Sequence, residues 1–215
     1  MRQVGIVGAI LAVIAVVGAG LLAGTKEVTE PTIQANQRAD RLSQLHELIP
    51  DDRFDNDLLE DTIQVRDRAH LGIPGPVTVY RARQDEEPVA AAFRVVAPDG
   101  YNGDIQLLVA IWSDGTLAGV RTITHAETPG LGDGIEVAKS DWITQFRGRS
   151  LGDPPASEWK VKKDNGAFDQ MTGATITSRA VVKAVQRALT FYERRGNAAL
   201  FAEPTTGEPG EGSQP

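Results

Sequence analysis

The feature that most constrains this chain is an apolar segment near its start. Residues 4–24 carry no charged or strongly polar side chain, and no other segment of the 215-residue sequence is comparable. As a helix rising about 1.5 Å per residue, such a segment spans roughly 30 Å, the thickness of the hydrocarbon core of a bilayer. The sequence therefore predicts one transmembrane helix in contact with the lipid bilayer, within an N-terminal anchor over residues 1–25.

The charges that flank the apolar segment predict its orientation. Arg2 and the α-amino group precede it, whereas Lys26 on the other side is followed by Glu27 and Glu30. Positive charge stays on the cytoplasmic side, so we expect a cytoplasmic N-terminus and a domain outside the cytoplasm. The alternative is a cleaved signal peptide, for which Leu22-Ala23-Gly24 offers small residues. The segment is longer than a typical signal sequence, which favours an uncleaved anchor.

Composition excludes several classes of function. The net charge is −7, which argues against nucleic-acid binding, because that requires clustered Lys and Arg. Cysteine is absent, so the chain forms no disulfide, thiolate nucleophile or cysteine-ligated cluster. His46, His70 and His125 are dispersed and predict no metal site. The acidic stretch 51–57 lacks the ligand spacing of an EF-hand and is expected to be a solvated loop.

Apolar periodicity predicts an α+β fold with a mainly antiparallel sheet and flanking helices. Strand-like patterns occupy residues 62–66, 77–81, 89–96, 105–112 and 117–124. Asp114-Gly115 fits the turn of a hairpin. Helices are expected over 31–48, which leads from the membrane to the domain, and over 137–146.

The last helix is expected to follow Thr177-Ser178, a plausible N-cap pair. One apolar face recurs at a spacing of three and four residues, at Val182, Val185, Leu189 and Tyr192. Arg194-Arg195-Gly196 fits the C-terminal end. This reading divides the chain into a connecting helix and acidic loop (26–60), a domain (61–196) and a disordered tail rich in Pro, Gly and Glu (197–215).

Just before this helix stands the segment Asp169-Gln170-Met171-Thr172-Gly173-Ala174-Thr175. Its small residues allow a bulky ligand to approach the backbone closely, and a helix start suits a phosphate. The alternative is structural: Thr175 only caps the helix, and spacing alone favours that reading.

A second cluster, residues 125–134, follows the last predicted strand and contains three glycines. His125 and Glu127 could serve as an acid–base pair, or the cluster could be a rigid glycine turn that satisfies its own backbone. If it folds against the 169–175 turn, the two segments form opposite walls of a pocket.

The pattern Asp169-x-x-Thr172-Gly173-Ala174-Thr175 resembles the flavinylation motif of the FMN-binding domain family. That domain occurs in one of the subunits of the Rnf-type electron transport complex and in one of those of the sodium-pumping NADH:quinone reductase. Residues 125–133, 141–146 and 174–182, with the single N-terminal span, resemble the Rnf protein. The resemblance implies that a separate flavin transferase joins the FMN phosphate to Thr175 through a phosphoester.

The resemblance also implies the rest of the site, with no catalytic residue and no metal ligand. Gly173 and Ala174 leave room for the ribityl chain, Leu131 packs on the isoalloxazine ring, and Asp169 acts while the transferase works. The implied cofactor-binding residues are Glu127, Thr128, Gly130, Leu131, Asp169, Thr172, Gly173, Ala174, Thr175, Thr177 and Ser178.

The implied function is that of a membrane-anchored flavoprotein in the bacterial inner membrane, with a periplasmic domain. It would relay electrons within a complex that couples electron transfer to ion translocation, and would act as an enzyme only as a subunit of that complex. The implied partners are the other subunits of the complex and the transferase. Two alternatives remain: a membrane-tethered binding or scaffold domain without a cofactor, and a hydrolase that uses His125 and Glu127.

Overall fold

The computed structural model describes residues 38–202 continuously, together with residues 6, 11, 15–16, 18–20, 29–30 and 35–36. Most of the predicted membrane segment 4–24 and the end of the predicted tail, 203–215, lie outside the described residues. Among the residues that are described, no helix has both the length and the apolar character needed to cross a bilayer. The chain divides into two units, residues 1–43 and 44–215, and the second contains the sheet.

Five antiparallel strands form one sheet in the order in which they follow along the chain. Tight turns explain this order: Asp85 and Glu86 both have positive φ between the second and third strands, and Gly115 does so between the last two. The prediction of an α+β fold with an antiparallel sheet is confirmed. The strands are β1 (Thr62–Val65), β2 (Val77–Gln84), β3 (Glu87–Ala97), β4 (Ile105–Trp112) and β5 (Leu117–Thr124).

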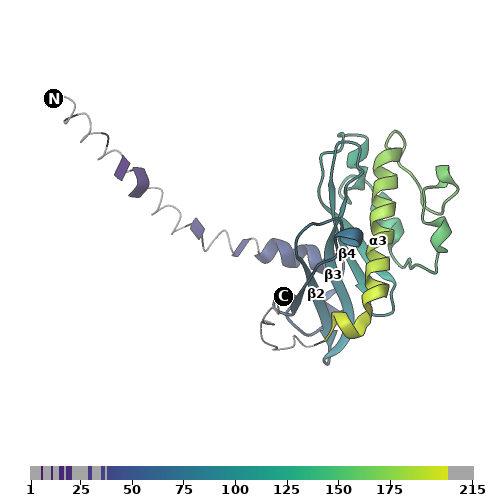
Figure 1. Cartoon of the computed structure of the whole chain (residues 1–215), viewed down its shortest axis with the longest axis horizontal. Coiled ribbons are helices and arrows are strands. Elements are labelled where there is room, and N and C mark those ends of the chain that lie inside the picture. Colours follow the sequence, from purple (N-terminus) through teal and green to yellow (C-terminus); the bar gives the residue numbers. More distant parts are fainter. Residues whose placement is uncertain are drawn as a thin grey trace, which may run out of the picture. The chain divides into compact units, whose positions relative to one another are not determined.

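One long helix, α3 (Thr175–Leu200), lies along one face of the sheet (Figure 1). Its apolar face includes the fully buried Val181, Val185 and Phe191, and the ring of Phe191 meets Phe93 of β3 edge-on at 5.2 Å between centroids. Shorter helices surround this core. They are η1 (Asp51–Arg53), α2 (Arg68–Leu71), η2 (Gly132–Ile135), η3 (Trp142–Phe146), η4 (Ala156–Glu158) and η5 (Lys162–Asp164).

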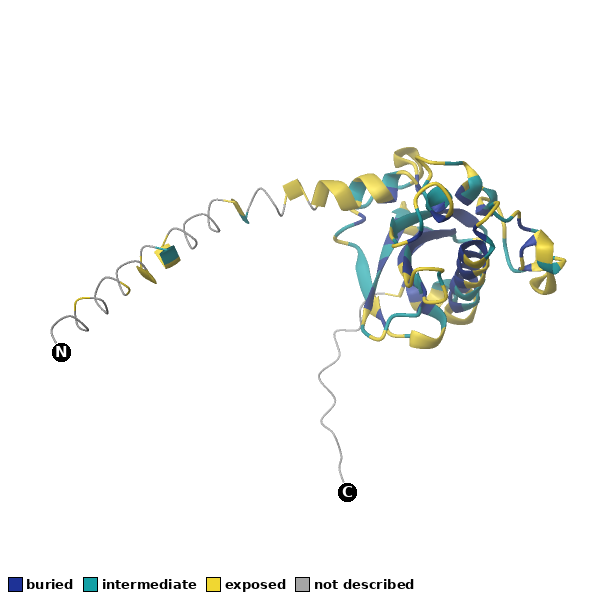
Figure 2. Cartoon of the chain, turned by 90° about the horizontal axis from the view of Figure 1, so that it is seen from above, coloured by how far each residue is buried: buried dark blue, intermediate teal, exposed yellow. Residues whose placement is uncertain are grey.

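The opposite face of the sheet is also covered. Leu45, Leu48, Ile49 and Leu58 form a second apolar cluster against the small side chains that β3 and β4 present on that face. Figure 2 shows the central strands buried. Burial on both faces explains why β3 and β4 are continuous apolar runs rather than alternating ones. The folded unit therefore begins N-terminal to residue 61, the predicted start of the domain.

The start of α3 differs from the prediction. The helix begins at Thr175 and not after Ser178, so Thr175 occupies its first turn. Ser178 does not cap the helix, because its buried hydroxyl donates to the carbonyl oxygen of Ala174 at 3.0 Å, inside the first turn. A serine that bonds four residues back is compatible with helix, whereas an N-cap serine bonds forward.

The end of α3 fits the prediction in part. Gly196, with φ 69° and ψ 160°, interrupts the helix where the sequence indicates, but a further helical turn follows to Leu200. Leu200 and Phe201 are buried in the main core, so residues 197–202 belong to the folded unit and not to a disordered tail. The predicted helix over 137–146 is a turn followed by the 3-10 helix η3, because the Ser140 hydroxyl bonds the Gly134 carbonyl oxygen and bends the chain there.

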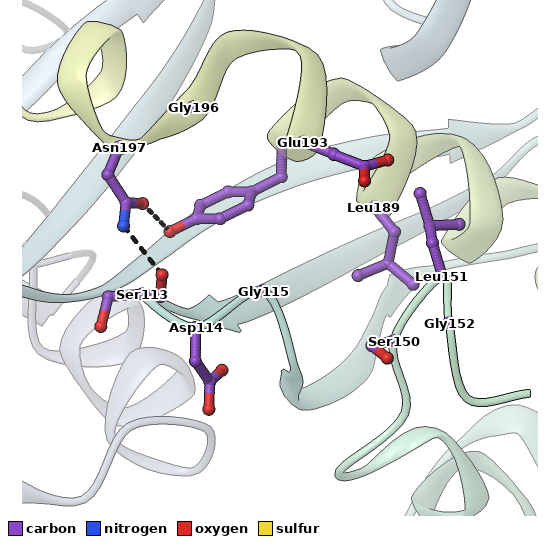
Figure 3. A pocket seen from close by; sticks show the side chains of 11 residues that line it. Ser113, Asp114, Gly115, Ser150, Leu151, Gly152, Leu189, Glu193, Gly196 and Asn197 are labelled. Atoms are coloured by element: carbon purple, nitrogen blue, oxygen red, sulfur yellow. Dashed lines mark hydrogen bonds between the residues drawn. The ribbon is translucent and has the colours of Figure 1, made fainter.

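A cavity of about 380 Å³ lies where this kink meets the β4–β5 hairpin (Figure 3). The Tyr192 hydroxyl donates to Asn197 Oδ1, and Asn197 Nδ2 donates to the Ser113 carbonyl oxygen at 2.8 Å. Burial, with a smaller contribution from the charge of Asp114, raises the pKa of Tyr192 to about 12, so its hydroxyl stays protonated. These contacts fix the chain beyond Gly196 on the hairpin.

A charged cluster also holds the end of the described chain. Asp61 accepts from Arg81 Nε at 2.5 Å and from Arg83 Nε at 2.8 Å. The same two guanidinium groups donate to the carbonyl oxygens of Ala202 (2.8 Å) and Phe201 (2.7 Å). Because Arg81 is only 4% exposed, the Asp61 carboxylate neutralises a charge that water does not reach.

Replacing Asp61 by asparagine is therefore expected to lower the free energy of unfolding by about 2–4 kcal/mol. Urea denaturation of the detergent-solubilised chain, followed by tryptophan fluorescence, measures it, since all three tryptophans lie in the folded unit. Asp52→Asn on the exposed η1 makes the same change in charge and is the matched control. Equal midpoints for the two variants would contradict the role given to Asp61.

Candidate functional site

A cavity of about 550 Å³ brings together the two clusters that the sequence singled out. One wall comes from the loop after β5 and the other from the turn into α3. Segments separated by some 40 residues in sequence thus share one concave surface, the usual form of a small-molecule site. The lining residues are Tyr101, Glu127, Thr128, Leu131, Gly132, Lys163, Gly173, Ala174, Thr175, Ile176 and Thr177.

The turn into α3 depends on Gly173. Its φ is 79°, a left-handed conformation that side chains other than glycine rarely adopt, and the Ala174 N–H closes the turn on the Met171 carbonyl oxygen at 3.1 Å. A Cβ atom at Gly173 would stand 3.0 Å from Leu131 Cδ2. The missing side chain lets the two walls touch through Leu131, which stays 49% exposed at the rim.

Thr175 lies in the first turn of α3 and lines the cavity. The residue before it, Ala174, has no side-chain oxygen to cap the helix, and no side chain caps this end. The first N–H groups of a helix have no partner inside the helix and lie at the positive end of its dipole. The cavity therefore has a hydroxyl beside backbone donors suited to an anion.

Glu127 carries a buried carboxylate on the opposite wall, where it is 4% exposed. Its Oε1 accepts from the backbone N–H of Asn102 at 3.0 Å, and its Oε2 accepts from the Thr177 hydroxyl of α3. Gly132 makes room for this link, because a Cβ there would lie 2.8 Å from Glu127 Cβ and 2.9 Å from Glu127 Oε2. The link ties the loop to the first turn of α3.

His125 supports this loop from behind. Its Nδ1 accepts from the backbone N–H of Glu127 at 3.0 Å, and its Nε2 lies 2.8 Å from Glu136 Oε1. The hydrogen-bond network assigns the proton to Nε2, which donates to Glu136. Both ring nitrogens are thus engaged and His125 does not line the cavity. This arrangement does not favour the hydrolase alternative, which needs a free base facing the cavity.

Four residues of the predicted site do not line the cavity: Gly130, Asp169, Thr172 and Ser178. Ser178 is fully buried and shapes the turn, since its Oγ accepts from the Met171 N–H at 3.0 Å as well as donating to Ala174. The Asp169 carboxylate is 66% exposed and forms an ion pair with Lys162 at 2.6 Å. Gly130, with φ 76°, makes the bend of the loop, and Thr172 is exposed.

Four cavity residues were not among those predicted: Tyr101, Gly132, Lys163 and Ile176. Tyr101 (64% exposed) and Ile176 (46% exposed) are large apolar side chains on the surface, and with Leu131 they form an apolar rim around the cavity. Exposure of this kind marks a binding surface, but sequence patterning does not reveal it. Gly132 stands within the predicted 125–134 cluster, and that was its only signal.

Comparison with known proteins identifies the class and then the family. The FMN-binding domain family matches residues 100–190, which include the described cavity, and the RnfG N-terminal region family matches residues 2–48. By fold and site the chain is thus an FMN-binding domain protein. It belongs to the RnfG family, whose members are subunits of the ion-translocating oxidoreductase complex, and this confirms the resemblance noted from the motif.

Three relatives named as this subunit of the ion-translocating oxidoreductase complex illustrate the match. The chain is 44% identical to the protein of Shewanella baltica, over 92% of each chain. It is 46% identical to that of Shewanella loihica over 89% of this chain and 90% of the relative. It is 44% identical to that of Pseudomonas aeruginosa, again over 92% of each. The similarity therefore extends well beyond the FMN-binding region.

Proposed function

We propose that this chain is a membrane-anchored flavoprotein subunit that carries FMN on Thr175 and relays electrons within an ion-translocating oxidoreductase complex. Family membership supports the flavin and the complex. The observation that carries the attachment point is the Thr175 hydroxyl, which lines a cavity at the start of α3 beside backbone donors that lack helical partners. The phosphate of FMN would be esterified at that hydroxyl.

The residues of the cavity fit the remaining parts of FMN. Gly173 and Ala174 present little side chain, so the ribityl chain has room beside the turn. The isoalloxazine ring would lie against Leu131 and the apolar rim, with Thr128 at its polar edge. Bound FMN would supply one- and two-electron redox chemistry, while the protein holds it, limits its contact with water and sets the charge around it.

Residues outside the cavity lining have supporting roles in this proposal, as does the link between its walls. Thr177 and Glu127 lock the two walls together, and Ser178 shapes the turn that presents Thr175. The exposed Asp169 carboxylate is available to a flavin transferase that approaches the turn from solvent. A phosphoester retains the cofactor where free flavin, once lost, would be hard to replace.

The anchor completes the proposal. Residues 4–24 would cross the inner membrane once, with a cytoplasmic N-terminus and the flavin domain in the periplasm. One span does not form an ion path, so this chain contributes a redox centre and the other subunits of the complex carry the ion.

The test is the visible spectrum of the protein purified from cells that contain the transferase, followed by peptide mass spectrometry. We expect flavin absorbance between 350 and 500 nm that survives denaturation. The tryptic peptide over residues 164–179 should carry the added mass of FMN less water, on Thr175 in its fragment series. A colourless protein would favour the scaffold alternative, and modification of another hydroxyl would move the attachment site.

A further inference from the structure

We propose that the Lys163 ammonium group is the counter-charge that binds the flavin phosphate at Thr175. This inference rests on the proposed function and adds to it a cofactor-binding residue outside the flavinylation motif. Among the described residues that line the cavity, Lys163 alone carries a positive charge. A phosphate joined to a threonine through one ester and to the ribityl chain through another keeps one negative charge, which a neighbouring ammonium group stabilises.

The other lysines around the turn are already paired. Lys162 Nζ lies 2.6 Å from Asp169 Oδ1, and Lys183 Nζ lies 2.8 Å from Asp99 Oδ2. The hydrogen bond from Lys183 lowers the pKa of Asp99, as expected of a lasting pair. Within the part of the chain that the structure describes, Lys163 forms no such ion pair with a carboxylate. Its charge is uncommitted.

The loop that bears Lys163 is held beside the start of α3. Asp164, the next residue, receives two hydrogen bonds of 2.6 Å from Arg179, which lies one turn beyond Thr175 on α3. This hydrogen bonding lowers the pKa of Asp164. The backbone N–H of Lys163 donates to Gln170 Oε1 at 3.2 Å, on the segment that leads into the turn. These two contacts therefore fix the Lys163 backbone next to the phosphate position.

The charges of the cavity give the bound flavin a direction. Glu127 places a buried carboxylate on the wall opposite the turn, and a phosphate near it would be repelled. Lys163 and the N-terminus of α3 attract the phosphate at the other side. The cavity is thus polar from end to end, and this orients FMN with its phosphate at Thr175.

The test compares FMN with riboflavin, which has the same ring but no phosphate. The full chain in detergent, with Thr175→Val to prevent covalent attachment, is titrated with each flavin, and quenching of flavin fluorescence gives the dissociation constants. Adding Lys163→Met should weaken FMN binding about tenfold or more, the loss expected for one charge-assisted hydrogen bond. Riboflavin binding should change less than about twofold, and Lys163→Arg should retain most of the FMN affinity.

Lys160→Met is the matched control, because Lys160 is exposed on the same loop and does not line the cavity. An equal loss for both flavins, or no loss for FMN, would overturn the proposal. If neither flavin binds the Thr175→Val chain, the ³¹P resonance of the covalently loaded protein decides: Lys163→Met should shift it and Lys160→Met should not. A wild-type chain that acquires no flavin at all would instead refute the proposed function.

Discussion

Replacing Thr175 by alanine is expected to abolish covalent flavin while leaving the domain folded. The substitution removes the acceptor hydroxyl, and alanine is well tolerated in the first turn of a helix. We expect the free energy of unfolding to change by less than about 1 kcal/mol. Flavin fluorescence of the denatured protein band and urea denaturation measure the two quantities separately.

Two further variants sharpen this test. Thr172→Ala removes an exposed hydroxyl of the same motif that does not line the cavity, so labelling should persist if the transferase tolerates the change. Thr175→Ser keeps a hydroxyl without the methyl group, and we expect partial labelling. Covalent flavin that survives in Thr175→Ala would place the attachment at another residue.

The second large effect is expected at Gly132. An alanine there places its Cβ 2.8 Å from Glu127 Cβ and 2.9 Å from Glu127 Oε2, a separation that side chains do not adopt. Glu127 then has to move, and the Thr177 hydroxyl and the Asn102 N–H lose their acceptor. We expect a loss of about 2–3 kcal/mol in the free energy of unfolding, together with poor flavin incorporation.

Gly75→Ala is the control for that experiment, because a Cβ at Gly75 meets nothing within 4 Å and its φ is not positive. Urea midpoints report stability, and the ratio of flavin to protein absorbance reports incorporation. Should Gly132→Ala load flavin fully and unfold at the control's midpoint, the link between Glu127 and Thr177 would not be needed to form the site.

The sheet could be predicted from the sequence because its signals are local. Alternation marked β1 and β2, continuous apolar runs marked β3 and β4, and Asp114-Gly115 marked the final hairpin. The limits of α3 were harder, since a serine near a helix start can bond forward as a cap or back into the turn. Ser178 does the second, and only the packing around it decides which.

The site was predictable where a motif carried it and not elsewhere. Thr175, Gly173 and Leu131 belong to recognisable segments, but their meeting depends on tertiary contacts such as the close approach of Gly134 to the Met171 sulfur. Lys163 comes from a loop with no pattern of its own, and its significance arises from which neighbouring charges are paired. Such information exists only in three dimensions.

The apolar rim of Tyr101, Leu131 and Ile176 bears on the order of assembly. It borders the cavity in which Thr175 lies, so an enzyme that delivers flavin to the folded domain has to work across it. A redox partner that exchanges electrons with the ring benefits from the same short approach. Two proteins do not occupy one surface together, so loading has to come first, and a chain docked before maturation would remain permanently without colour.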